Sequence, residues 1–470
     1  MSYIKRIIET ELLMKMAASG AVLIKGPKSC GKTATAQQYA QSVLSLDRDP
    51  QVPVMMATNP QLLLEGKKPR LIDEWQEQPE IWNYVRHEVD FQQSKGLFIL
   101  TGSANPPENV RLHSGAGRFT FIQMHTLSWQ ELGFSKGAVS LGDLLIGAVK
   151  DFFEPAVSLE FILERICIGG WPTLINADID TALNLNRGYI DLVCEVDMSQ
   201  VSSVKRNPQK VRSILRSLSR NVSTLVDNKT LEKDIKLNES DEVSRNTLSD
   251  YLDALSKLML LYEQPAFNPH IRSAASLRKT SKKHLCDTSL TVAALGLDKD
   301  ALLQDIKYAG FLFESLAIHE LNVYANANDA SVYHYNDSYG NEVDAIVQKR
   351  NGDYAAFEIK LGVGYIDDAV ESLKKFEANI DTGKMRLPKS LNVITGTGDE
   401  AGAYLAQHPG VAMVSVTGDT ATGKRIAAAG ASTVKRLHLE LGGKAPVLVF
   451  DDADVDLVAS TMRAASFWNA

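Results

Sequence analysis

Cysteine is scarce in this 470-residue chain, and long hydrophobic runs are missing from it. The four cysteines are far apart and include no Cys-x-x-Cys pair, so we expect neither a disulfide framework nor a zinc site. They are Cys30, Cys167, Cys194 and Cys286. No stretch offers the run of about 18 apolar residues that spans a membrane. Because charges interrupt the apolar residues of the N-terminal stretch 1–19, it does not resemble a signal peptide. We therefore expect a soluble, cytoplasmic protein that does not bind membranes.

An excess of positive charge is also missing. The chain has 50 Lys and Arg residues and 57 Asp and Glu residues, which gives a formal net charge of −7. This balance excludes a protein that coats nucleic acid along its whole surface, although a local basic patch remains compatible with it. With 44% hydrophobic and 23% charged residues, the composition is that of a folded protein. The length indicates several domains.

Short apolar runs alternate with helical patterns over residues 1–135. Ala21–Ile24 is an apolar run that predicts a first buried strand, Leu71-Ile72 ends a second strand, and the apolar run Leu97–Leu100 predicts a third. Strands separated by helices are typical of a parallel sheet in an α/β domain.

A phosphate-binding loop follows the first of these strands. The sequence GPKSCGKT fits the pattern G-x-x-x-x-G-K-[ST] and is followed by a helical pattern, which is the context that this motif requires. We expect ATP to bind through Gly26, Pro27, Lys28, Ser29, Cys30, Gly31, Lys32 and Thr33. Lys32 would reach the β- and γ-phosphates, and the Thr33 hydroxyl would ligate Mg²⁺.

Three further positions fit ATP hydrolysis. Asp73, at the end of the second strand, is a candidate Mg²⁺ ligand, and the adjacent Glu74 could polarise water. The third strand is followed by Thr101-Gly102-Ser103, where a hydroxyl could sense the γ-phosphate. Of these residues we assign that role to Ser103. Arg118 is a candidate arginine finger acting on a neighbouring subunit, which would make the protein a homo-oligomer, or else a surface arginine.

Several separate motifs in the first 390 residues resemble one family of prokaryotic AAA-type ATPases. They are KGPKSCGKT, RLIDEWQ, FILTGSAN, GAGR, LSWQELG and GGWPTL. Members of that family carry a C-terminal domain of unknown function similar to restriction nucleases. The resemblance implies a P-loop core, a winged-helix middle domain and a nuclease-like end.

The middle of the chain, residues 136–285, has mostly helical patterns. One of them, after Ser244, places Leu248, Tyr251, Leu252, Leu255 and Leu258 on one stripe. This stripe resembles the recognition helix of a winged helix, which could contact DNA or a protein partner. A basic stretch from Lys205 to Arg220 is either a solvated helix face or a nucleic-acid contact.

Paired carboxylates mark the stretch that follows. Asp344 lies on one predicted strand, and Glu358 and Lys360 lie on the next, joined by an Asn351-Gly352 turn. This arrangement resembles restriction-endonuclease-like folds. Asp344 and Glu358 could hold Mg²⁺, Lys360 could orient water, and Glu314 could supply a third carboxylate. The alternative is a hairpin with a solvated charged face.

The end of the chain resembles NAD-dependent aldehyde dehydrogenases, especially those acting on aminoaldehydes. Gly418 and Gly423 match cofactor-loop glycines of that family, and Glu440 matches its general base. The sequence stops before the position of the family's catalytic cysteine, and nothing supplies the first part of the dinucleotide fold. We therefore expect a chimera whose tail binds NAD poorly and lacks dehydrogenase activity.

The expected fold is α/β multidomain. It comprises a P-loop AAA-type parallel sheet in 1–135, a helical winged-helix domain in 136–285, a restriction-endonuclease-like domain in 286–396 and a truncated Rossmann-like tail in 397–470. The leading functional hypothesis is a Mg²⁺-dependent ATPase whose nuclease-like domain acts on nucleic acid. The alternatives are a nucleotide-gated interaction module with an inert nuclease-like domain and a dehydrogenase fragment. The physiological partner and the oligomeric state stay open.

Overall fold

The computed structural model divides the chain into two units, Met1–Gly398 and Asp399–Ala470. It describes residues 3–103, 115–148, 157–201, 205–239, 243–268, 280–337, 340–383, 385–396, 413–418, 420–431 and 434–441. Within these ranges, no helix is both long and apolar enough to cross a membrane. All four cysteines are free and buried.

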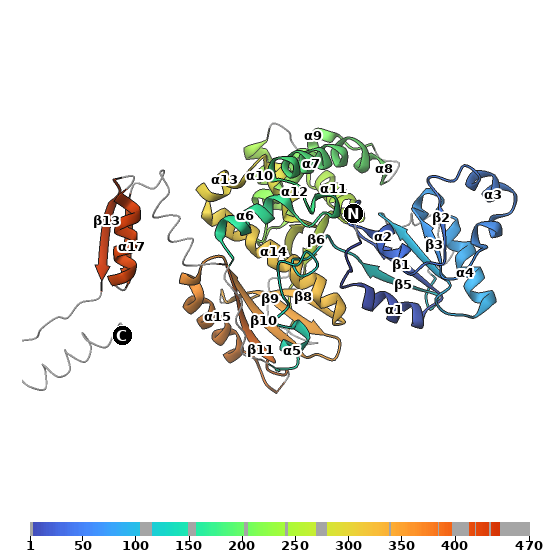
Figure 1. Cartoon of the computed structure of the whole chain (residues 1–470). Coiled ribbons are helices and arrows are strands. Elements are labelled where there is room, and N and C mark those ends of the chain that lie inside the picture. Colours follow the sequence, from blue (N-terminus) through green and yellow to red (C-terminus); the bar gives the residue numbers. More distant parts are fainter. Residues whose placement is uncertain are drawn as a thin grey trace, which may run out of the picture. The chain divides into compact units, whose positions relative to one another are not determined.

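The first unit begins with a five-stranded parallel sheet of order β2-β3-β4-β1-β5 (Figure 1). The strands are β1 (Ala21–Lys25), β2 (Ser42–Ser45), β3 (Arg70–Asp73), β4 (Phe98–Gly102) and β5 (Phe119–Gln123). The helices around it are α1 (Glu9–Ala18), α2 (Lys32–Gln37), α3 (Val52–Thr58), η1 (Pro60–Leu64), η2 (Trp75–Glu77) and α4 (Ile81–Gln92). The parallel α/β prediction is confirmed, and the three predicted strands form the centre of the sheet.

Successive side chains of β1 pack alternately into two hydrophobic cores, one on each face of the sheet. Ala21 and Leu23 pack with Trp82 and Val85 of α4, whereas Val22 and Ile24 pack on the other face with residues of α1 and α2. Successive side chains of a strand point to opposite faces, so a continuous apolar run is what a strand covered on both faces requires.

Helices dominate the middle of the unit, but a strand pair interrupts them. The helical elements are α5 (Leu141–Leu144), α6 (Leu159–Ile168), η3 (Pro172–Leu174), α7 (Ile179–Leu192), the π-helix η4 (Val193–Asp197), α8 (Met198–Gln200), α9 (Pro208–Arg220), α10 (Asn228–Asn238), α11 (Arg245–Lys257), α12 (Thr288–Leu295) and α13 (Lys299–Gln304). The predicted stripe on α11 is confirmed, since all five of its residues are buried.

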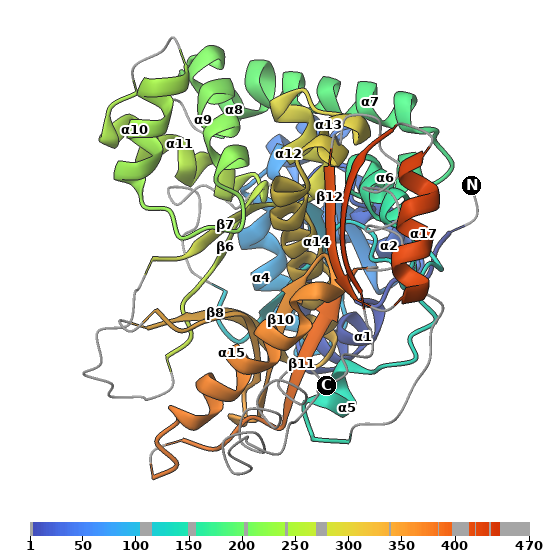
Figure 2. The same cartoon turned by 90° about the vertical axis from the view of Figure 1, so that its left-hand side faces the viewer.

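The mostly helical middle also contains one pair of strands that was not located from the sequence. Strands β6 (Leu261–Gln264) and β7 (Lys282–Leu285) form an antiparallel pair directly after α11. Figure 2 shows α9, α10 and α11 beside this pair.

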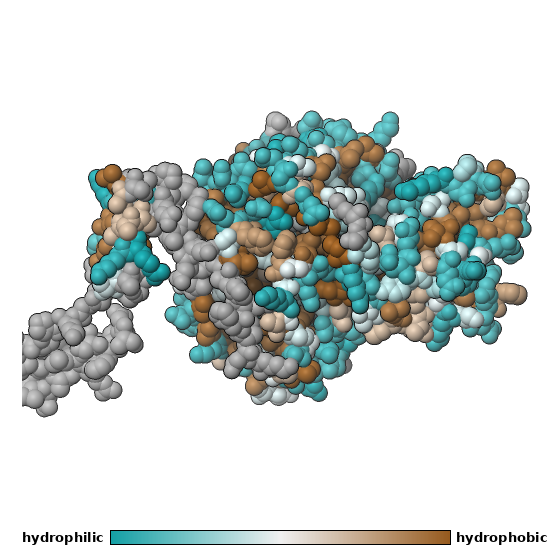
Figure 3. Space-filling model, in the orientation of Figure 1, coloured by the Kyte–Doolittle hydropathy of each residue, from teal (hydrophilic) through white to brown (hydrophobic). Residues whose placement is uncertain are grey.

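The unit ends in a mixed four-stranded sheet of order β11-β10-β9-β8. Its elements are α14 (Ile306–Ala327), β8 (Ala330–Asn336), β9 (Glu342–Lys349), β10 (Tyr354–Lys360), η5 (Val363–Tyr365), α15 (Ile366–Ala378) and β11 (Ser390–Thr395). Strands β9 and β10 form the expected hairpin, and Gly352 adopts a positive φ of 87° in its turn. On the drawn face of the chain, hydrophobic and hydrophilic residues are interspersed (Figure 3).

The second unit has one described β-α-β segment. It consists of β12 (Met413–Gly418), α17 (Thr420–Ala431) and β13 (Arg436–Leu441), with the two strands parallel. Gly418 ends β12, Gly423 lies in α17, and Glu440 lies in β13.

Candidate functional site

The predicted phosphate loop connects β1 to α2 and depends on both of its glycines. A Cβ atom at Gly26 would lie 2.3 Å from the Met124 carbonyl oxygen, so no side chain fits there. Gly31 has a φ of 102°, which residues with a side chain rarely adopt. The loop therefore takes the tight path that lets backbone N–H groups surround an anion.

Lys32 lies inside this loop and is only 5% exposed. Its ammonium donates hydrogen bonds to the carbonyl oxygens of Gly26, at 3.0 Å, and Pro27, at 2.8 Å. A buried ammonium needs such partners, because burying an unpaired charge is costly. The side chain is thus already positioned within the loop, and both of these partners are neutral acceptors.

Asp73, at the end of β3, accepts hydrogen bonds from two hydroxyl groups. The Thr33 hydroxyl donates to Asp73 Oδ1 at 2.8 Å, and the Thr101 hydroxyl donates to the same oxygen. Hydroxyl and carboxylate oxygens are the ligands that Mg²⁺ takes in nucleotide sites, so these residues fit the expected ion. Ser103, the residue selected from the sequence, is buried after β4, whereas Thr101 from the same predicted segment contacts Asp73.

Glu74 follows Asp73 in a left-handed conformation, with a φ of 53°. A non-glycine residue rarely adopts this conformation, and such strain tends to occur at functional sites. The Gln76 amide donates a hydrogen bond to the Glu74 carboxylate. Glu74 is therefore half-buried and held in place by a residue that the sequence did not single out.

Arg118 and the phosphate loop lie at opposite ends of the strands of the sheet. It directly precedes β5, whose first residue pairs with Ala21 at the start of β1, whereas the loop follows the end of β1. Its guanidinium is exposed and forms a 2.7 Å ion pair with Asp90, whose pKa is lowered by this hydrogen bond. Arg118 therefore does not approach the phosphate loop of its own chain.

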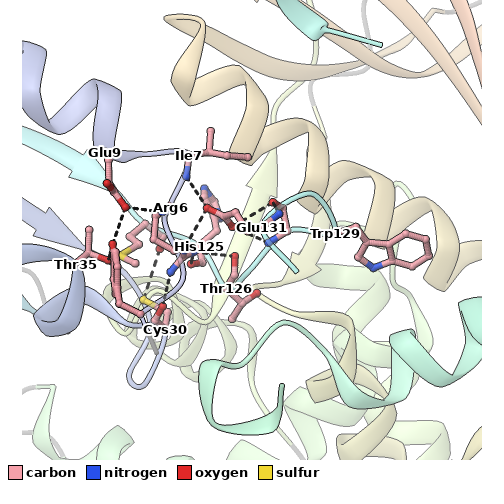
Figure 4. Close-up of polar contacts among 12 residues, drawn as sticks. Arg6, Ile7, Glu9, Cys30, Thr35, His125, Thr126, Trp129 and Glu131 are labelled. Carbon is pink, nitrogen blue, oxygen red and sulfur yellow. Dashed lines mark hydrogen bonds and ion pairs between the residues drawn. The ribbon is translucent and has the colours of Figure 1, made fainter. Parts of the chain in front are cut away.

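A buried arginine that precedes α1 ties the phosphate loop to the segment after β5 (Figure 4). Arg6 donates to the Cys30 carbonyl oxygen at 2.9 Å and to Glu131 Oε1 at 3.0 Å. It also donates to the carbonyl oxygen of His125 at 2.9 Å. The loop is therefore held at Cys30 by the Arg6 guanidinium, which the sequence pattern did not indicate.

The loop also contacts the helical middle of the unit. The Lys28 ammonium lies 2.6 Å from Asp197 Oδ1, and the Tyr189 hydroxyl donates to the Lys28 carbonyl oxygen at 3.4 Å. Asp197 ends the π-helix η4, a helix type that frequently occurs at functional sites. A movement of the Lys28 ammonium would therefore break or weaken its contact with Asp197 in this helix.

A second polar cluster lies on the β9–β10 hairpin, as the sequence predicted. The Lys360 ammonium lies 2.6 Å from Glu358 and 3.0 Å from Asp344. Burial and the nearby Asp344 raise the pKa of Glu358 to about 7. Burial also acts to raise the pKa of Asp344, but Lys282 and Lys360 together lower it below its usual value.

Lys282 of β7 completes this cluster. Its ammonium lies 2.8 Å from Glu314, 2.9 Å from Glu342 and 3.7 Å from Asp344. Burial raises the pKa of Glu314 to about 8 despite this contact.

The expected metal ligands Glu314, Asp344 and Glu358 thus have ammonium partners. In the part of the chain that the structure describes, no three Asp, Glu, His or Cys residues are grouped so that they could hold a metal ion. The residues present therefore do not fit the nuclease-type Mg²⁺ site that was expected here.

Residues 18–133 match the family described as an AAA domain. This range contains all five strands of the parallel sheet, the phosphate loop, Asp73 and Thr101. The N-terminal region of the chain is an AAA domain. Such a domain implies nucleotide binding, in agreement with the loop geometry.

Three other families match later parts of the chain. Residues 159–301 match a domain of unknown function (DUF8612), and residues 309–404 match a second one (DUF4143). Residues 382–470 match the aldehyde dehydrogenase family, so the last two ranges overlap. The C-terminal region is thus a partial aldehyde dehydrogenase sequence.

Two solved structures with similarity to the chain are aldehyde dehydrogenases. One, from Burkholderia cenocepacia, is 19% identical and covers 60% of this chain, with a TM-score of 0.16. The other, a variant of aldehyde dehydrogenase C from Pseudomonas syringae with NAD⁺ and octanal, is 15% identical and covers 61%, with a TM-score of 0.15. The chain spans 48% of the length of each.

Proposed function

We propose that the protein is a Mg²⁺-dependent ATPase. The observation that carries this proposal is the set of contacts around Asp73, where the Thr33 and Thr101 hydroxyls meet at the end of β3. This set lies beside a loop that already contains the Lys32 ammonium. The adjacent Glu74 supplies a carboxylate for activating water.

Each residue has a distinct task in this proposal. Lys32 exchanges the carbonyl oxygens of Gly26 and Pro27 for phosphate oxygens of ATP. Thr33 and Asp73 would hold Mg²⁺, which neutralises negative charge on the phosphates when bound. Glu74 accepts a proton from the attacking water, and Gln76 keeps its carboxylate oriented. Arg118 would act on the site of a neighbouring copy, because in its own chain it lies at the opposite end of the strands from the phosphate loop.

The contact between Lys28 and Asp197 suggests what the nucleotide controls. Lys28 belongs to the loop that binds phosphate, and an anion arriving there competes with Asp197 for the same ammonium. Nucleotide binding would thus loosen the π-helix η4 from the loop. This coupling supports a nucleotide-gated interaction module.

A nucleic-acid-stimulated ATPase is the second candidate. The succession α9, α10, α11, β6 and β7 supports it, because three helices followed by a strand pair are the elements of a winged helix. Against it, the arginines of the basic stretch form ion pairs with carboxylates of the same chain. These pairs are Arg206–Asp250, Arg212–Asp191, Arg216–Glu239 and Arg220–Asp234.

An ATPase assay of the full chain, with and without DNA, separates the two candidates. We expect Mg²⁺-dependent phosphate release that duplex and single-stranded DNA leave unchanged within twofold, because the paired arginines are already neutralised. DNA stimulation that falls with salt and is removed by Arg245→Glu, at the exposed start of α11, would instead favour the second candidate. Lys95→Glu, at an exposed position of the AAA domain, is the matched charge control.

The aldehyde-dehydrogenase-like region is expected to be dispensable for nucleotide binding. Strand β11 pairs with β10 inside the first unit, and the unit ends at Gly398. A chain shortened to residues 1–398 should therefore bind ATP as the full chain does, measured by fluorescent-nucleotide titration. The full chain should form no NADH from an aminoaldehyde, since all four cysteines of the sequence precede the matched range. NADH formation that disappears in Glu440→Ala would contradict this expectation.

A further inference from the structure

Lys282 lies among carboxylates from two different elements. It is 1% exposed, and its ammonium contacts Glu314 of α14 and both Glu342 and Asp344 of β9. We propose that this ammonium is a tethered cation that occupies the position a divalent metal ion would need among these carboxylates. The cluster then holds the β6–β7 pair, α14 and β9 together and takes up no Mg²⁺.

The donor chemistry supports this assignment. An ammonium group has three hydrogen-bond donors and no lone pair, so it satisfies carboxylates but cannot ligate a metal. Two of its contacts, at 2.8 and 2.9 Å, have the length of charge-assisted hydrogen bonds. An incoming cation would meet this positive charge at short range. Burial opposes the charged form of Lys282, yet the three carboxylates raise its pKa above the usual value.

Lys360 occupies the other side of the same cluster. It contacts Glu358 and the second oxygen of Asp344. That oxygen also accepts a hydrogen bond from the Ile359 backbone at 2.8 Å. Asp344 therefore has a cation on each of its two carboxylate oxygens, which leaves it poorly placed to bind a third.

The backbone holds Lys282 where it is. In the β6–β7 pair, Lys282 lies directly opposite Gln264. The Gln264 amide donates to the Asp344 carbonyl oxygen at 2.9 Å and to the Tyr333 carbonyl oxygen at 3.0 Å. Gln264 thereby fastens the strand pair, and with it the backbone of Lys282, to β8 and β9.

Binding of Mn²⁺ to the nucleotide-free full chain tests the proposal directly. Electron paramagnetic resonance counts the bound ions, and an Asp344→Asn variant identifies any ion that belongs to this cluster. We expect the parent chain and Asp344→Asn to bind the same number of Mn²⁺ ions. A parent chain that binds one ion more than Asp344→Asn would overturn the proposal.

Removing the ammonium should create the missing metal site. Lys282→Ala should bind one additional Mn²⁺ ion, which the double variant with Asp344→Asn loses, and Mn²⁺ should raise its melting temperature more than that of the parent. Lys283→Ala is the matched control, because the neighbouring Lys283 pairs with Glu263 instead. A Lys282→Ala chain that gains no ion, or that stays unfolded at every Mn²⁺ concentration, would also overturn the proposal.

Discussion

Mg·ATP at about 100 times its Kd should stabilise the parent protein by about 2.7 kcal/mol, and Lys32→Ala should remove this gain. The Lys32 ammonium is the buried positive charge inside the phosphate loop, and its present partners are neutral carbonyl groups. Replacing it by a methyl group leaves the phosphates without their main counter-charge. Thermal melts at a series of ATP concentrations measure the effect, and ATPase activity should be lost with it.

The control for Lys32→Ala is a lysine at the other end of the same sheet. Lys95 is exposed and lies just before β4, away from the phosphate loop. Lys95→Ala should therefore keep the full ATP-dependent shift of the melting temperature. Absence of any shift in the parent protein, or an equal shift in Lys32→Ala, would contradict the proposed ATP site.

The central strands of the first sheet could be predicted, but its edges could not. Strands β1 and β4 are covered on both faces, so their sequences are continuous apolar runs. Strands β2 and β5 form the two edges of the sheet, and Val43 and Phe121 on them are 46% and 41% exposed. A short, half-exposed edge strand gives a weak hydrophobic pattern, which explains why neither was predicted.

The phosphate loop was readable because its chemistry is local. Its glycines, Lys32 and Thr33 lie within eight consecutive residues, and the position of Asp73 followed from the strand before it. Arg6 and Lys282 were missed because their partners are remote in sequence. Arg6 pairs with Glu131, which is 125 residues away, and Lys282 pairs with Glu314 across 32 residues. Such partners meet only in the folded chain, so their spacing in the sequence does not predict the contact.

The β6–β7 pair shows a second limit of sequence reasoning. A tight hairpin is announced by a turn of two to five residues. Here the strands are separated by residues 265–281, without a short turn signal between two alternating runs. Lys282 was therefore assigned to a helical region, although it lies in the strand that completes the carboxylate cluster.

Glu74→Gln should leave ATP binding intact and reduce kcat by roughly 10²- to 10⁴-fold, the usual contribution of a general base. The amide has the size of the carboxylate and can still bond to Gln76, so the strained backbone at this position should persist. What the amide cannot do is accept the proton of the attacking water. Single-turnover hydrolysis and fluorescent-nucleotide titration separate the two effects.

The matched control for this last variant is Glu77→Gln, which makes the same chemical change in the same short turn. Glu77 is exposed at the end of η2, whereas Glu74 is half-buried directly after the strand that carries Asp73. If position relative to Asp73 decides the chemistry, Glu77→Gln should hydrolyse ATP at the parent rate, while Glu74→Gln accumulates bound ATP. Parent-like turnover in Glu74→Gln would place the base elsewhere. Loss of ATP binding in Glu74→Gln would show instead that this carboxylate holds the site together, because catalysis alone would leave affinity unchanged.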